Sequence, residues 1–417
     1  MKMMPTRKFL YMLVAIVAVG AILRLGWIGS QAPTGDDVMV AVTATNYVAN
    51  GQPNPTEPFH PVLRNLLVYA SMMVFGGSPL GVKGFSLLLG TLLVGVTGLF
   101  VRRAARDERA GLFAAGLVAL DIVQIDYSRQ AIQEVHTAFF AMVGAWLVVE
   151  ALRAEDTRSW RWLLPLAGVS YGLGVASKFY ALSTLVLSIG LLLASSWKRR
   201  KYDEVLLTGA ALVPLPFTVY LLTYVPWFRR GYGIAEWVTF QRATMSAMTT
   251  HTKAPVAYLA YNKAAMWFLQ PFYGYADVAT TAAGQMQLSV AVGNPLVWLA
   301  VVPATLYAVI VPGQRRRDAI LLAYFATAYL PLVLSSRPIW MLSSVAVFPF
   351  AAGVLGSVAA ALTRRASRRV VWAYVAVVIA TSLLLYPLAI GRALRFPYLQ
   401  PIVARMGDYV NAQGAAQ

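Results

Sequence analysis

Two adjacent carboxylates, Asp36 and Asp37, follow the first long apolar segment of the chain in the run Pro33-Thr-Gly-Asp-Asp-Val38. Acidic residues are costly at a lipid boundary and usually mark a pathway, a partner or a reactive centre. Only 17 Asp and Glu occur in the 417 residues. A pair at this position is therefore the best single indication of chemistry in the chain.

Other unusual polar residues stand near the ends of apolar segments, and we expect them on the same side of the membrane. They are His60, Arg64, Arg129, Glu134, Lys178 and Arg337. Arginine donates a bidentate fork to phosphate oxygens, so external Arg and Lys beside carboxylates suit the phosphate of a lipid. Each residue also has a simpler interpretation: His60 as a helix cap, Asp126 and Arg129 as a structural pair, and Arg64, Lys83 and Lys178 as side chains that snorkel to headgroups.

The composition defines the elements that must position these residues. The chain is 59% hydrophobic and 12% charged, and it contains no cysteine. Soluble domains carry roughly 25% charged residues, and apolar runs near the ~20 residues of a membrane span recur throughout. These features predict an all-α polytopic membrane protein without disulfides. The net charge of +18 could suggest nucleic acid. However, the basic residues fall in short clusters between apolar segments, as the positive-inside rule describes, so we expect no nucleic acid partner.

The basic clusters predict the topology. They stand at residues 2–8, 102–109, 153–161, 198–201, 315–317 and 364–369. If all face the cytoplasm, an even number of crossings separates neighbouring clusters. The run Val62–Phe75 is too short for a comfortable span, so we assign it to an interfacial helix in the first external loop. The result is about eleven transmembrane helices, an uncleaved first helix over Phe9–Ile28, and an external C-terminus.

The same topology predicts the domain organisation. Residues 1–391 form one transmembrane domain with large external loops at about 30–78 and 226–290, and residues 392–417 form a short external tail. The second loop is rich in Trp and Tyr, which favour the headgroup level of a membrane. Stacking of these rings on sugar faces is an equal alternative.

Several motifs occur in a characteristic order. They are Gly35-Asp36-Asp37, then Pro58-Phe59-His60-Pro61-Val62-Leu63, Tyr127-Ser128-Arg129 with Glu134 five residues later, Ala176-Ser177-Lys178-Phe179, Gly293-Asn294-Pro295-Leu296-Val297-Trp298, and Arg337-Pro338-Ile339-Trp340. In this order the chain resembles the protein O-mannosyltransferase and lipid A aminoarabinose-transferase family, which are GT-C glycosyltransferases, over about residues 9–350. It departs from that family at Asp37 in place of Glu, Val62 in place of Pro, Phe179 in place of Trp and Glu134 in place of Asp. A Trp-Trp-Asp motif is absent, which argues against transfer to Asn.

The resemblance implies a GT-C-type fold and an inverting transfer of a sugar from a polyprenyl-phosphate donor at the external face. A hydroxyl acceptor needs a positioned base. Asp36 matches the first family carboxylate and is the expected base. Asp37 is expected to orient the acceptor or to tune the proton affinity of the two carboxylates. Arg129, Lys178 and Arg337 are the expected donor phosphate ligands.

Two further residues receive roles from the resemblance. His60 is expected to bind the acceptor or the donor sugar. Glu134 either joins Asp36 around a divalent cation, Mg²⁺ or Mn²⁺, or forms a salt bridge that holds Arg129. The expected location is the plasma membrane, with the active site on the external face and membrane lipids around it.

The sugar and the acceptor stay open at this stage. Mannose on a secreted protein, aminoarabinose on lipid A, or a sugar on a cell-wall glycan all fit the pattern. Three competing classes also stay open: a transporter or flippase of a lipid-linked sugar, a polysaccharide polymerase or ligase, and a non-catalytic membrane scaffold. A transporter would show inverted repeats and matched broken helices, and a polymerase or ligase would depend on Arg and His in a large external loop.

Overall fold

Helices dominate the structure, a computed structural model that describes residues 6–53, 60–250, 263–271, 275–280, 286–335, 339–365 and 368–404. The first half contains α1 (Thr6–Leu25), α2 (Gly35–Asn50), α3 (Leu63–Phe75), α4 (Pro79–Ala105), α5 (Glu108–Leu120), α6 (Ile122–Ser128), α7 (Gln133–Arg153), α8 (Thr157–Ser177) and α9 (Ala181–Arg199). The second half contains α10 (Tyr202–Leu212), α11 (Pro214–Leu222), α12 (Val225–Arg229), α13 (Ile234–Thr250), β1 (Tyr275–Thr280), β2 (Met286–Ala291), α15 (Pro295–Ile310), α16 (Pro312–Val333), α17 (Phe348–Arg365) and α18 (Arg368–Ala389).

Membrane-spanning segments are numerous. Within the described ranges, six helices are long and apolar enough to cross a bilayer, and there are up to eight spans if two bent helix pairs each form one. The bends are 59° between α5 and α6 and 119° between α15 and α16. The prediction of a helical integral membrane protein is confirmed, whereas the count of eleven spans stays a prediction.

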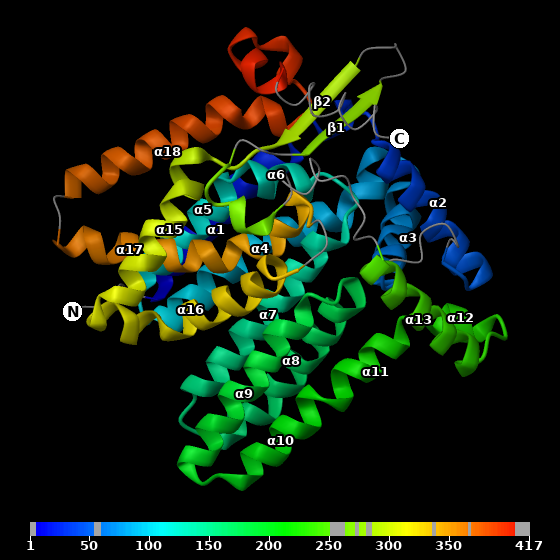
Figure 1. The fold of residues 1–417 in the computed structure, drawn as a ribbon, viewed down its shortest axis with the longest axis horizontal. Helices are drawn as coiled ribbons and strands as arrows, with labels where there is room; N and C mark the ends of the chain where they lie inside the picture. Colours follow the sequence, from blue (N-terminus) through cyan, green and yellow to red (C-terminus); the bar gives the residue numbers. More distant parts are fainter. Residues whose placement is uncertain are drawn as a thin grey trace.

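Two parts of the first predicted external loop are helical. The short apolar run expected over Val62–Phe75 forms α3, which begins at Leu63 and has 13 residues. Residues 35–50, for which we expected a loop, form α2. Both helices lie together beside the N-terminal part of α4 (Figure 1). They carry Asp36 and Arg64 to the same region of the molecule.

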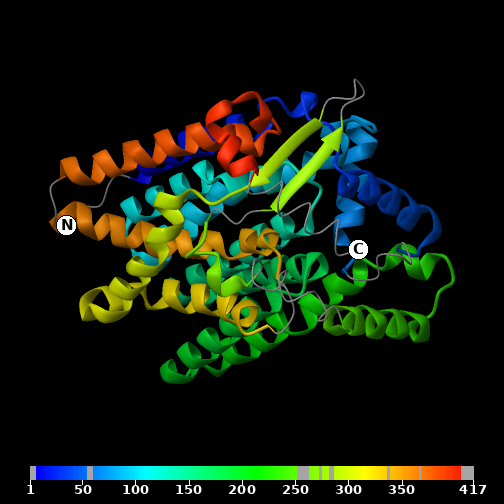
Figure 2. The same ribbon diagram turned by 45° about the horizontal axis from the view of Figure 1, so that its top comes forward.

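The second predicted loop contains the main departure from an all-α fold. Strands β1 and β2 form an antiparallel hairpin in which Tyr275 pairs with Ala291 and Thr280 with Met286. The hairpin lies across α6 and α18, as Figures 1 and 2 show. Leu288 and Val290 of β2 are buried there, and Leu399 from the predicted tail joins the same cluster. The tail therefore begins as packed structure rather than as a free extension.

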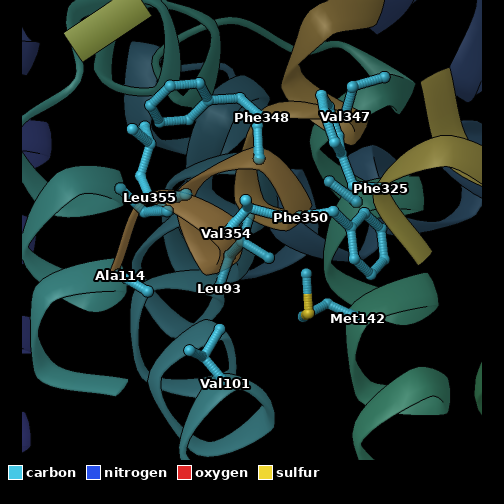
Figure 3. Packing of buried hydrophobic residues seen from close by; sticks show 14 of the residues in the cluster. Leu93, Val101, Ala114, Met142, Phe325, Val347, Phe348, Phe350, Val354 and Leu355 are labelled. Carbon is cyan, nitrogen blue, oxygen red and sulfur yellow. The ribbon is translucent and has the colours of Figure 1, made fainter. Parts of the chain in front are cut away.

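The core lies between α4, α5, α7, α16 and α17. Figure 3 shows Leu93 and Val101 of α4 facing Phe350 and Val354 of α17, with Met142 of α7 close by. Small residues permit this proximity: a Cβ on Gly356 would lie only 2.6 Å from the carbonyl oxygen of Ala110. Close backbone approach of this kind is how helices associate where lipid removes the hydrophobic driving force. The result is a rigid frame for the side chains at the N-terminal ends of α4 and α7.

Candidate active site

The N-terminus of α2 presents the acidic pair in a defined geometry. Thr34 is the N-cap residue: its hydroxyl accepts a hydrogen bond from the amide of Asp37 at 3.2 Å, and Asp37 Oδ2 accepts from the Thr34 amide at 2.9 Å. This reciprocal arrangement is a capping box, formed by an N-cap hydroxyl and an acidic residue three positions later. It fixes Asp37 against its own helix start and leaves Asp36 one position earlier, on the exposed side.

Asp37 is enclosed by the protein. Its side chain is 1% exposed, Oδ1 accepts from the amide of Ala131 at 3.1 Å, and Oδ2 lies 3.0 Å from the ammonium of Lys83, which is 0% exposed. Snorkelling is therefore the wrong interpretation of Lys83. A carboxylate occupied in this way is not positioned to contact an acceptor, so the structure favours a structural role for Asp37.

Asp36 has the properties of a reactive carboxylate. It is exposed at the surface of the chain, yet enough protein surrounds it that burial raises its pKa above the ordinary value. The positive charge of Arg64 opposes this effect, and the negative charges of Asp37 and Glu134 reinforce it. The structure thus brings Asp36, Arg64 and Glu134 into one electrostatic neighbourhood. A raised pKa makes a carboxylate a stronger base toward a hydroxyl.

Arg64 belongs to this neighbourhood by direct contact as well as by charge. It is 9% exposed, and its Nη1 donates to Gln133 Oε1 at 2.7 Å. Snorkelling is therefore wrong for Arg64 too, and its proximity to Asp36 is a feature that the sequence did not reveal. Its position in the first turn of α3, four residues after His60, was the available signal.

Glu134 and Lys178 form a buried ion pair between the start of α7 and the end of α8. The ammonium of Lys178 contacts Glu134 Oε1 and also lies 4.7 Å above the ring of Tyr180. Glu134 is 1% exposed, and its Oε2 has no hydrogen-bond partner among the described residues. The predicted alternative, in which Glu134 holds Arg129, is wrong because the partner of Glu134 is Lys178.

Arg129 has a different set of contacts. It is fully buried after α6, and its Nη1 donates to the carbonyl oxygens of Arg24 and Gly26 at 2.6 and 2.7 Å. In the part of the chain that the structure describes, its Nε and Nη2 have no hydrogen-bond partner. Arg129 therefore holds the turn after α1 and retains two donors.

The other two predicted site residues contribute less to the geometry. His60 is half-buried just before α3, on the segment that leads to Arg64. Arg337 lies outside the described residues. Across the described ranges, no three His, Asp or Glu side chains converge as metal ligands.

The Gly-Asn-Pro-x-x-Trp motif has a structural role. Asn294 caps α15 through the amide of Leu296 at 3.1 Å and donates to Ser382 of α18 at 2.8 Å. Trp298 donates through Nε1 to Asp121 Oδ2 at 2.6 Å, at the bend between α5 and α6. A Cβ on Gly293 would lie 2.4 Å from the Trp298 ring, so only glycine fits there. The motif ties α15 to the bend that precedes Arg129.

Known structures define the fold class. The chain has the GT-C fold: it superposes on the Saccharomyces cerevisiae protein O-mannosyltransferase Pmt1-Pmt2 complex bound to the sugar donor with a TM-score of 0.76, at 12% identity over 93% of this chain and 91% of that one. ArnT from Cupriavidus metallidurans bound to undecaprenyl phosphate gives a TM-score of 0.59, at 17% identity over 92% of this chain and 65% of that one.

Sequence comparisons agree with the fold. Residues 66–244 match the family model described as dolichyl-phosphate-mannose-protein mannosyltransferase. A polyprenol-phosphate-mannose–protein mannosyltransferase of Mycobacterium tuberculosis (strain CDC 1551 / Oshkosh) is 26% identical, over 80% of this chain and 77% of that protein. A Corynebacterium glutamicum relative of the same name is 22% identical, over 70% and 68%. The predicted resemblance to the protein O-mannosyltransferase and ArnT group is confirmed.

Proposed function

We propose that this chain is a membrane glycosyltransferase that moves mannose from a polyprenyl-phosphate donor to a hydroxyl group of a protein. The observation that carries the proposal is Asp36, an exposed carboxylate with a raised pKa at the start of α2, next to Arg64 and the Glu134–Lys178 pair. Relatives named as polyprenol-phosphate-mannose–protein mannosyltransferases support the donor and the acceptor class.

The proposed reaction is an inverting displacement at the anomeric carbon. Asp36 accepts the proton of the acceptor hydroxyl while the oxygen attacks the sugar, and the bond from that carbon to the phosphate oxygen breaks. The polyprenyl phosphate leaves with the electron pair and needs positive charge rather than a proton. No second carboxylate nucleophile is required, unlike in a retaining glycosidase.

Cationic side chains stabilise the leaving phosphate in this proposal. Within the described ranges, two donors of Arg129 have no hydrogen-bond partner, and Lys178, at the end of α8, contacts the carboxylate of Glu134. Guanidinium and ammonium groups placed where charge develops lower the barrier most effectively in a water-poor site. We assign Arg337 to the same task from its motif, and His60 to sugar or acceptor binding.

The predicted divalent cation would be held by Asp36 and Glu134, to which the described residues add no third acidic or histidine ligand. Mg²⁺ is bound in proteins by as few as one or two carboxylates together with waters and substrate phosphates. A metal therefore stays a prediction, and each step of the proposed reaction is assigned to side chains of this chain.

The proposed location is the plasma membrane, with Asp36 on the external face. The support is the placement of basic clusters between apolar segments. The acidic ends of α2 and α7 lie at one end of the long helices, whereas Arg102, Arg103 and Arg153 lie at the opposite ends of α4 and α7.

Transfer from a labelled donor tests the proposal. The purified protein is incubated with polyprenyl-phosphate [³H]mannose and a Ser/Thr-rich peptide, and covalent label in the peptide is measured. Asp36→Asn should abolish transfer while the thermal midpoint and donor binding are retained. Asp203→Asn is the matched control, because Asp203 is also an exposed aspartate in the first turn of a helix. Full activity of Asp36→Asn would refute the assignment of the base.

The same assay separates the alternatives. A transporter or flippase moves the intact donor between leaflets and leaves the peptide unlabelled. A mannosyltransferase with a glycan acceptor would leave the peptide unlabelled and label cell-wall material added in its place, whereas an aminoarabinose transferase would label neither.

A further inference from the structure

A buried lysine lies directly behind the acidic pair. Lys83 stands in the first turns of α4, a candidate membrane span, and is 0% exposed. A charged side chain inside a span is expensive and usually serves a function together with a specific partner. Its partner is Asp37, at 3.0 Å. This pair could not be predicted from the sequence, because Asp37 and Lys83 are 46 positions apart and on different helices.

The carboxylate of Asp37 connects three segments. Oδ2 accepts from the Thr34 amide at 2.9 Å at the start of α2 and meets Lys83 of α4. Oδ1 accepts from the amide of Ala131 at 3.1 Å, in the loop between α6 and α7. Each of these contacts is buried, so they act together and exclude water.

The same three segments carry the reacting groups of the proposed function. The residue before Asp37 is Asp36. Two residues after Ala131 comes Gln133, which holds Arg64 at 2.7 Å, and then Glu134, whose charge acts on Asp36. The pair therefore fixes the distance between the base and the residues that set its charge environment.

We propose that Lys83 is a positioning residue that acts through Asp37 to hold Asp36 toward the substrate. This inference rests on the proposed function. A displacement of about 1 Å at a reacting group can lower the rate by roughly 100-fold. The expected effect of losing the pair is thus a large loss in kcat with little change in the KM for the donor, since both side chains are enclosed by the protein.

A control ion pair lies just beyond the C-terminal end of α4. Asp107 caps α5 and is 5% exposed, and its Oδ2 accepts from Arg364 of α17 at 2.6 Å. It lies about 36 Å from Lys83 at 1.5 Å per helical residue. Arg364→Met removes one of the two guanidinium partners of the buried Asp107, the other being Arg317, at a site remote from Asp36. It should lower stability and leave kcat unchanged.

The experiment compares Lys83→Met, Asp37→Asn, the double variant and Arg364→Met as purified, folded proteins. We expect kcat about 100-fold below wild type in each single site variant, with the donor KM within about twofold. The double variant contains no uncompensated buried charge, but the contact that joins α2 to α4 is still lost. Its kcat should therefore recover only to about 10-fold below wild type.

The outcomes are distinguishable from failure of the proposed function. Absence of transfer by the wild-type protein, or full activity of Asp36→Asn, would refute the proposed function whatever Lys83 does. With those two results as expected, a Lys83→Met protein whose kcat matches that of Arg364→Met would overturn the positioning role. If Lys83→Met does not fold, a double variant with wild-type kcat would overturn it equally.

Discussion

Replacement of Lys178 by methionine tests how the buried charge of Glu134 is stabilised. Glu134 is 1% exposed, its Oε1 contacts Lys178, and its Oε2 has no hydrogen-bond partner within the described ranges. Lys178→Met therefore leaves a buried carboxylate without its counter-charge. Breaking a buried pair from one side costs about 3–5 kcal/mol. At roughly 2 °C per kcal/mol, the lower value for larger domains, the thermal midpoint should fall by about 6–10 °C.

The opposite substitution should cost less. In Glu134→Gln the amide oxygen still accepts from Lys178, and the ammonium keeps its position over the ring of Tyr180. The double variant Lys178→Met/Glu134→Gln removes both charges and should recover most of the lost stability. Thermal unfolding of the four purified proteins in detergent measures these differences. Equal losses in both single variants, or no recovery in the double variant, would refute the argument that Lys178 compensates Glu134.

A second measurement on the same proteins tests the donor role of Lys178. Polyprenyl phosphate that binds the folded state raises the thermal midpoint, and the rise grows with the logarithm of its affinity. The wild-type midpoint should rise with added polyprenyl phosphate, and the rise should be smaller in the double variant. An identical rise in both would show that Lys178 serves only Glu134.

The pH dependence of transfer follows from the raised pKa of Asp36, which must be deprotonated to act as the base. The ratio kcat/KM should decline as the pH falls through that pKa. Arg64→Met should move this decline to higher pH, because it removes the positive charge that lowers the pKa of Asp36. A pH profile unaffected by Arg64→Met would contradict this prediction. Trp298→Phe removes the indole donor to Oδ2 of Asp121 at the α5–α6 bend and should cost about 1–3 kcal/mol, measured by thermal unfolding. Gly293→Ala places a methyl group inside the Trp298 ring contact and should lower the midpoint at least as much, and an unchanged midpoint would show that the loop yields freely.

The sequence predicted the helical membrane class, because composition carries that information. Its ordered motifs singled out Asp36, Glu134 and Lys178, and the roles of these residues stay a prediction. It did not distinguish Asp36 from Asp37 in exposure, although the Thr34-x-x-Asp37 spacing of a capping box was readable. The sequence also could not distinguish a snorkelling lysine from a buried one, since the burial of Lys83 depends on an ion pair with a residue far away in the chain. The hairpin of β1 and β2 was missed although β2 alternates apolar Met286, Leu288 and Val290 with polar Gln287 and Ser289. This short period-2 pattern stands in a segment that we assigned to an external loop.

The different roles of the two adjacent aspartates follow from helix geometry. Successive residues in a helix project about 100° apart, since a turn has 3.6 residues. The capping box directs Asp37 back toward the N-cap and into the protein, so Asp36 must project away from it. Asp37 is then neutralised by Lys83, as Glu134 is by Lys178, and the field of Arg64 acts on Asp36. An exposed carboxylate with a raised pKa, such as Asp36, is suited to accept a proton. A carboxylate in a buried ion pair, such as Asp37, is suited to hold that base in position.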